Sequence, residues 1–109
     1  MSRAKGDIAE ERASEYLQSC GYFVVERNFY SRFGEIDIIA SKDDALHFIE
    51  VKSANEYELA IQNITPTKLS RLIKTAHVYM KKNGLDVDFM LDAVVVTPKE
   101  IILLENITI

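Results

Sequence analysis

Two neighbouring segments decide the fold of this 109-residue chain: Gly34-Glu35-Ile36-Asp37-Ile38-Ile39-Ala40 and Leu46-His47-Phe48-Ile49-Glu50-Val51-Lys52. Both are rich in β-branched and aromatic residues, and the polar residues 41–45 between them are typical of a turn. We therefore expect two antiparallel strands joined as a hairpin, in which successive side chains point to opposite faces.

This alternation places the charged residues of the two strands on one face. Glu35 and Asp37 share a face of the first strand, and the other face carries the apolar residues Ile36, Ile38 and Ala40. If the hairpin turns symmetrically about Asp43-Asp44, Asp37 faces Glu50 and Glu35 faces Lys52. The side chain of His47 then points away from the carboxylates, which favours a packing role for it.

Two opposed carboxylates need a compensating charge. Directly opposed residues have Cβ atoms about 4.5–5.5 Å apart, and like charges at that distance destabilise a sheet. Asp37 and Glu50 also have apolar neighbours, which raises the cost of burying their charge. A divalent cation with oxygen ligands, Mg²⁺ or Mn²⁺, would remove this cost. Lys52 points into the same site, where its ammonium can orient water or stabilise charge on a reacting phosphoryl group.

Simpler interpretations of the same residues stay open. Asp37 and Glu50 could be solvated charges on an exposed sheet face, although the adjacent Ile39, Leu46 and Phe48 argue against this. Lys52 could neutralise a neighbouring carboxylate as a structural ion pair. A slip of one residue in the register would separate the two acids and remove the site.

The rest of the chain predicts one α/β domain over residues 1–109. Spacing and end signals predict a helix from Ser2 or Asp7 to Cys20 and a second from the N-cap Thr65 to Gly84. Further strands are expected at residues 22–29, 89–97 and 101–107. The order α-β-β-β-α-β-β indicates a mixed β-sheet with helices packed on it.

Composition excludes several classes of protein. Apolar residues make up 48% and charged residues 28%, which is ordinary for a globular domain and excludes a disordered tail, a collagen or a coiled coil. No apolar stretch reaches the roughly 18–20 residues of a membrane span, and the charged N-terminus does not resemble a signal peptide. The single cysteine, Cys20, excludes an intrachain disulfide, so a reducing cytoplasm is the expected location.

Charge is unevenly distributed along the chain. The formal net charge of −4 argues weakly against a nucleic-acid-binding protein. Residues 59–85 nevertheless contain no acidic residue and carry five basic ones: Lys68, Arg71, Lys74, Lys81 and Lys82. A local field of this kind can attract a polyanion. Lys68, Arg71 and Lys74 could contact a DNA backbone, or they could form a solvated helix face, and both interpretations stay open.

The hairpin motif resembles a known family. Gly-Glu-Ile-Asp-Ile-Ile-Ala at 34–40 followed by Phe-Ile-Glu-Val-Lys-Ser at 48–53 is similar to the bacterial YraN family, and further matching positions are Glu10, Asn28, Thr65-Pro66, Lys68 and 92–96. This family resembles the restriction-endonuclease-like PD-(D/E)xK nucleases and the archaeal Holliday-junction resolvases. The resemblance implies a metal-dependent nuclease acting on branched or structured DNA. A non-catalytic module that binds nucleic acid or protein is the alternative.

The resemblance also implies roles for individual residues. Asp37 and Glu50 would hold Mg²⁺ or Mn²⁺ together with the backbone carbonyl of Val51, and Lys52 would be the catalytic lysine. Glu10 would complete the site from the first helix, although an acid near a helix start is also favourable by itself. Glu35 matches the family but has no predicted role. Relatives of this fold often act as homodimers, and the apolar segments 101–104 and 107–109 could pair across a two-fold axis.

Overall fold

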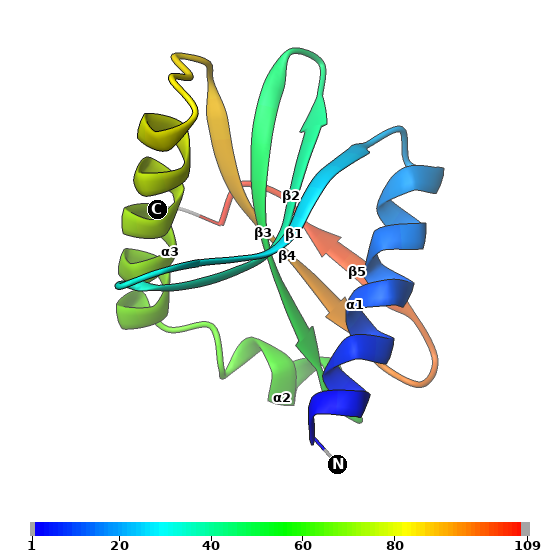
Figure 1. The fold of residues 1–109 in the computed structure, drawn as a ribbon. Coiled ribbons are helices and arrows are strands. Elements are labelled where there is room, and N and C mark those ends of the chain that lie inside the picture. The colour runs from blue at the N-terminus through cyan, green and yellow to red at the C-terminus, as the bar shows by residue number, and fades with distance from the viewer. Residues whose placement is uncertain (1, 108–109) are drawn as a thin grey trace.

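The computed structural model describes residues 2–107 as a mixed sheet between helices (Figure 1). In chain order the elements are α1 (Ser2–Ser19), β1 (Phe23–Ser31), β2 (Gly34–Lys42), β3 (Ala45–Ser53), α2 (Tyr57–Ile61), α3 (Pro66–Lys82), β4 (Phe89–Val96) and β5 (Ile101–Leu104). The five strands lie in the order β1-β2-β3-β4-β5, with β3 and β4 parallel and the other pairs antiparallel. The predicted fold class and element order are confirmed, and the short helix α2 is an addition.

Local signals position the element ends much as predicted. The Thr65 hydroxyl accepts the Lys68 N–H at 3.2 Å as an N-cap, and Gly84 follows α3 with a φ of +62°. The β2–β3 turn has left-handed φ angles of +51° at Asp43 and +66° at Asp44, which suit a tight hairpin. The first helix begins at Ser2, so the charged residues near position 7 lie inside it.

Each face of the sheet is covered by one long helix. On one face, Ala9, Ala13 and Leu17 of α1 pack against a cluster that includes Ile38, Ala40, Ile49 and Val94. On the other face, Leu72, Ala76 and Tyr79 of α3 pack against a second cluster that includes Phe29, Ile36, Ile39, Phe48 and Leu91. No helix within residues 2–107 is long and apolar enough to cross a membrane.

The prediction that Ile36 shares a face with Ile38 is wrong. Ile36 packs on the α3 side of the sheet, whereas Ile38 packs on the α1 side. The position between them on β2 is Asp37, and the residue between their β1 partners Arg27 and Phe29 is Asn28, which has a left-handed φ of +57°. The two strands therefore lose their regular alternation together at this point. This distortion places Asp37 between the two faces.

A buried carboxylate links the start of β3 to the segment that follows β5. Asp92 on β4 is fully buried, and its Oδ2 lies 2.6 Å from His47 Nδ1. Its Oδ1 accepts the Asn106 N–H at 2.8 Å. His47 also packs edge-on against the Tyr22 ring, with centroids 5.0 Å apart, which agrees with its predicted packing role. The pairing with Asp92 has no signal in the sequence.

Removing this carboxylate should destabilise the fold. We expect Asp92→Ala to lower the free energy of unfolding by about 3–5 kcal/mol, because it leaves His47 and the Asn106 N–H without their buried partner. Urea denaturation measures the change. The control Asp86→Ala removes an exposed aspartate and should change the free energy by less than about 0.5 kcal/mol. Equal stability of the two variants would contradict a structural role for Asp92.

Candidate metal centre

The candidate site lies where β2 separates from β3. The ladder between these strands runs from Lys42–Ala45 to Ile38–Ile49, in the register that the symmetric turn predicts. Beyond it, β1 and β2 turn away together towards α3, while β3 continues beside β4 (Figure 1). Asp37 and Glu50 are the first residues past the ladder. Among the described residues the ladder therefore reaches neither the predicted Asp37–Glu50 pair nor the predicted Glu35–Lys52 pair, because β2 has already diverged.

A side chain replaces the next ladder bond. The Asp37 Oδ2 accepts the Val51 N–H at 2.7 Å, so the backbone group that β2 no longer satisfies is satisfied by the carboxylate. This bond fixes Asp37 beside β3. Val51 was predicted to face a metal through its carbonyl. That role stays a prediction, and the role found here belongs to its N–H group.

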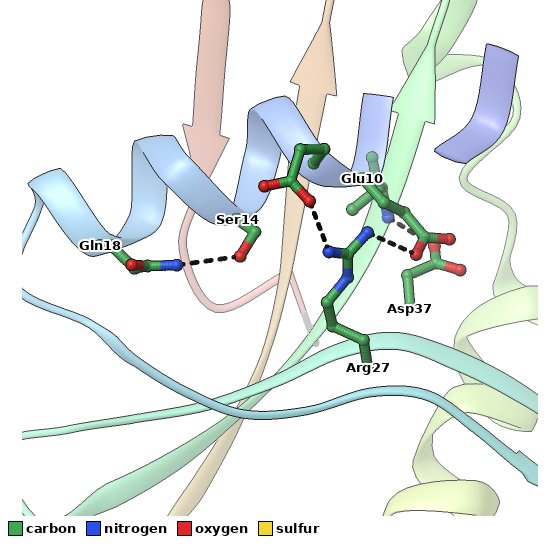
Figure 2. Close-up of polar contacts among 7 residues, drawn as sticks. Glu10, Ser14, Gln18, Arg27 and Asp37 are labelled. Carbon is green, nitrogen blue, oxygen red and sulfur yellow. Dashed lines mark hydrogen bonds and ion pairs between the residues drawn. The ribbon is translucent and has the colours of Figure 1, made fainter. Parts of the chain in front are cut away.

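Three carboxylates meet at this point. Glu10, Glu35 and Asp37 each contribute one oxygen, and these oxygens lie within 4.8 Å of one another. Glu10 comes from α1, whose buried Ala9 and Ala13 hold the helix against the sheet. Figure 2 shows the Glu10 and Asp37 side chains reaching the same point from the helix and the strand. We call Glu10, Glu35 and Asp37 the carboxylate cluster.

The carboxylate cluster differs from the predicted set of metal ligands. Glu35 had no predicted role, although its position two residues before Asp37 on one strand was a usable signal. Glu10 was predicted to approach the site, and it does. Glu50 is near enough to raise the pKa of Asp37, but its Oε1 lies 3.6 Å from the Lys52 Nζ in an ion pair. Its role as a ligand stays a prediction.

The cluster carries more negative charge than its surroundings neutralise. Burial raises the pKa of Asp37 to about 8, with the charges of Glu50, Glu10 and Glu35 acting in the same direction, although the Val51 N–H opposes the shift. Burial also raises the pKa of Glu10. The buried Glu10 Oε1 has no hydrogen-bond donor among the described residues. Such a site favours protons or a bound cation.

Arg27 is a functional neighbour that sequence reasoning missed. From β1 its Nη2 lies 3.5 Å from the Glu10 Oε1, and its Nη1 donates to the Glu11 Oε1 at 2.9 Å (Figure 2). The guanidinium therefore holds Glu10 in place and partly offsets the rise of its pKa. No pattern around Arg27 distinguishes it from other arginines on strands.

Basic side chains border the cluster on the α3 side. A hollow of about 210 Å³ is lined by the carboxylates of Glu35, Asp37 and Glu50 together with Lys52, Lys68 and Arg71. The pKa of Lys68 is lowered because the positively charged Lys52 ammonium lies close to it. Lys74 does not line the hollow; its Nζ lies 5.6 Å from the centre of the Phe33 ring.

The sequence comparisons identify the family. The uncharacterised protein family UPF0102 matches residues 9–96, a span that contains every residue of the carboxylate cluster. The chain belongs to the UPF0102 family. This is the YraN family indicated by the hairpin motif.

Relatives match over nearly the whole chain. A UPF0102 protein of Sulfurimonas denitrificans is 65% identical over 109 residues, covering 100% of both chains. A UPF0102 protein of Aliarcobacter butzleri is 50% identical and covers 99% of both. One from Helicobacter pylori is 52% identical over 106 residues, which is 97% of this chain and 92% of the relative. The alignments with these relatives therefore include the whole sheet and both long helices.

The raised pKa of Asp37 predicts how stability changes with pH. Because the folded protein binds this proton more tightly than the unfolded chain, the contribution is fully present below pH 4 and is lost as pH rises to about 8. The slope is at most about 1.4 kcal/mol per pH unit. Asp37→Asn, which mimics the protonated acid, should be more stable than wild type at pH 9 by a few kcal/mol.

Urea denaturation in EDTA between pH 5 and pH 9 measures this difference. The control Asp44→Asn changes an exposed aspartate in the hairpin turn, at a φ of +66° that asparagine also adopts. Its profile should run parallel to that of wild type. A parallel profile for Asp37→Asn as well would show that Asp37 does not hold a proton in the folded protein.

Proposed function

We propose that the protein is a metal-dependent nuclease of the restriction-endonuclease-like PD-(D/E)xK type, which hydrolyses phosphodiester bonds in DNA. The observation that carries this proposal is the convergence of Glu10, Glu35 and Asp37 where β2 leaves β3, with Lys52 on the adjacent strand. The resemblance of the hairpin motif to those nucleases supports it. Branched or structured DNA is the proposed substrate class, by the same resemblance.

The residues of the cluster suit Mg²⁺ or Mn²⁺. These ions prefer oxygen ligands, and the cluster supplies carboxylate oxygens from three residues within 4.8 Å. The raised pKa of Asp37, and the Glu10 Oε1 that makes no hydrogen bond to a described residue and has Arg27 Nη2 3.5 Å away, both indicate negative charge that a cation would stabilise. We propose Asp37 as the central ligand, with Glu10, Glu35, Glu50 and the Val51 carbonyl available around it. When bound, a divalent ion stabilises charge on a phosphoryl group and acidifies water.

Lys52 supplies a positive charge that is already positioned. Its Nζ lies 3.6 Å from the Glu50 Oε1, and both side chains are about a quarter exposed. The ion pair with Glu50 therefore orients the ammonium towards the hollow beside Asp37. There it can orient an attacking water and stabilise the negative charge that grows on the phosphorus oxygens. Lys68 and Arg71, in the same hollow, can hold the substrate phosphates.

A second copy of the chain is part of the same proposal. β5 forms an edge of the sheet, with Ile101–Leu104 half-buried, which agrees with the edge position predicted for this segment. Residues 108 and 109 of the predicted pairing segment lie outside the described residues. A homodimer through β5 would give two cleavage sites for the two strands of a substrate.

Loss of the site residues should abolish hydrolysis. We expect the wild-type protein to cut fluorescently labelled branched DNA in Mg²⁺ or Mn²⁺ and to be inactive in EDTA. Asp37→Ala and Lys52→Ala should each lower the rate by about 100-fold or more, because each removes charge stabilisation at the reacting phosphate. Single-turnover cleavage on denaturing gels measures the rates. Asp44→Ala, which changes an exposed aspartate in the hairpin turn, should retain full activity.

Two results would count against the proposal. Equal rates for wild type, Asp37→Ala and Lys52→Ala would assign the activity to a contaminating nuclease. Binding of DNA with no metal dependence and no hydrolysis would instead support the alternative, a non-catalytic binding module on the same fold.

A further inference from the structure

Two hollows adjoin at the carboxylate cluster. The hollow of about 210 Å³ on the α3 side and a second of about 300 Å³ on the α1 side are both lined by Glu35. The second hollow is also lined by Gly6, Asp7, Glu10, Asn28 and Tyr30. The two hollows therefore adjoin at Glu35, beside the point where Glu10, Glu35 and Asp37 meet, and we call the adjoining hollows the groove.

The two sides of this groove carry opposite charge. On the α3 side, Lys68 and Arg71 line the groove, and we call them the basic bank. On the α1 side, Asp7 and Glu10 line the groove, and no basic residue is among the described residues that line this hollow. We call Asp7 and Glu10 the acidic bank. The described lining of the groove can therefore attract a polyanion on one side only.

This asymmetry discriminates between forms of nucleic acid. A duplex carries phosphates on both of its strands, so one strand on the basic bank brings the other towards the acidic bank. A single strand has one row of phosphates, which the basic bank can accept alone. Its bases are uncharged and need a different surface, for which proteins use exposed aromatic rings.

The α1 side of the groove offers such a surface. Tyr30 is 64% exposed and lines the same hollow as Asn28, whose amide can donate and accept hydrogen bonds. Tyr30 pairs with Glu35 in the β1–β2 ladder, so its ring stands next to the carboxylate cluster. An aromatic ring and an amide are the groups that stack on and hydrogen-bond to an unpaired base.

We propose that the groove binds single-stranded nucleic acid, with a phosphate on Lys68 and Arg71 and the neighbouring unpaired base against Tyr30 and Asn28. The inference rests on the proposed function, because the strand crosses the cluster at which cleavage is proposed. Within branched DNA, the groove would accordingly take the unpaired strand, such as a flap or an open junction, rather than a continuous duplex arm.

Fluorescence anisotropy with the full chain tests the proposal. The probes are a labelled 20-nucleotide single strand without self-complementarity and the blunt duplex of the same sequence, in Ca²⁺, with probe integrity checked on a gel. We expect the single strand to bind at least ten-fold more tightly than the duplex. Equal binding, tighter duplex binding, or no measurable binding of the single strand would overturn the proposal.

Paired variants test the two halves of the groove. Lys68→Gln combined with Arg71→Gln should weaken single-strand binding by about ten-fold or more and reduce the salt slope by about 0.7, since the two residues hold one phosphate and each single-strand phosphate contact contributes about 0.7. The control, Lys81→Gln with Lys82→Gln, removes equal charge from the far end of α3 and should change affinity by less than two-fold. Equal losses in the two double variants would overturn the role of the basic bank.

Variants of Tyr30 test the proposed contact with the base. Tyr30→Ala should weaken single-strand binding by about five- to ten-fold without changing the salt slope, whereas Tyr30→Phe should bind like wild type, because stacking needs the ring alone. Unchanged binding by Tyr30→Ala would overturn the base subsite. Single-strand preference without hydrolysis in Mg²⁺ or Mn²⁺ would refute only the proposed nuclease. Hydrolysis combined with duplex preference would refute only this inference.

Discussion

The hydrogen bond from the Val51 N–H to the Asp37 carboxylate is the contact on which the rest of the site depends. β2 must leave β3 for a groove to exist, and leaving exposes backbone groups that the ladder would have satisfied. Asp37 satisfies one of them at 2.7 Å and is thereby held beside β3 with its second oxygen available. Asp37 therefore satisfies a backbone group at the end of the ladder and also forms the centre of the carboxylate cluster.

The surrounding fold brings the other charges to this point. The buried alanine-rich face of α1 holds Glu10 against the sheet, and Arg27 fixes its carboxylate. On the opposite side, the Thr65 cap starts α3 so that Lys68 and Arg71 border the same hollow. Because the carboxylates are only partly neutralised, burial and mutual repulsion raise the pKa of Asp37 to about 8. The negative charge that is not neutralised destabilises the folded protein, and a bound cation would remove this destabilisation.

The sequence alone was sufficient for the architecture and for half of the site. Alternation, caps and the Asp43–Asp44 turn predicted the elements, the β2–β3 register and the approach of Glu10 to Asp37. The left-handed backbone at Asn28 was not predictable from local pattern, and it accompanies the placement of Ile36 on the other face and the early end of the ladder. The contributions of Glu35 and Arg27 depend on how α1 and β1 meet in three dimensions, which residue spacing does not encode.

An experimental structure with Mn²⁺ is the most direct measurement, because the anomalous signal locates the ion independently of any activity. If Glu10, Glu35 and Asp37 form a cation site, a single strong peak should lie about 2.1 Å from an Asp37 oxygen and within reach of at least one other carboxylate. The peak should disappear in Asp37→Asn. A cluster without a peak at saturating Mn²⁺, or a peak bound by other residues, would contradict the metal centre.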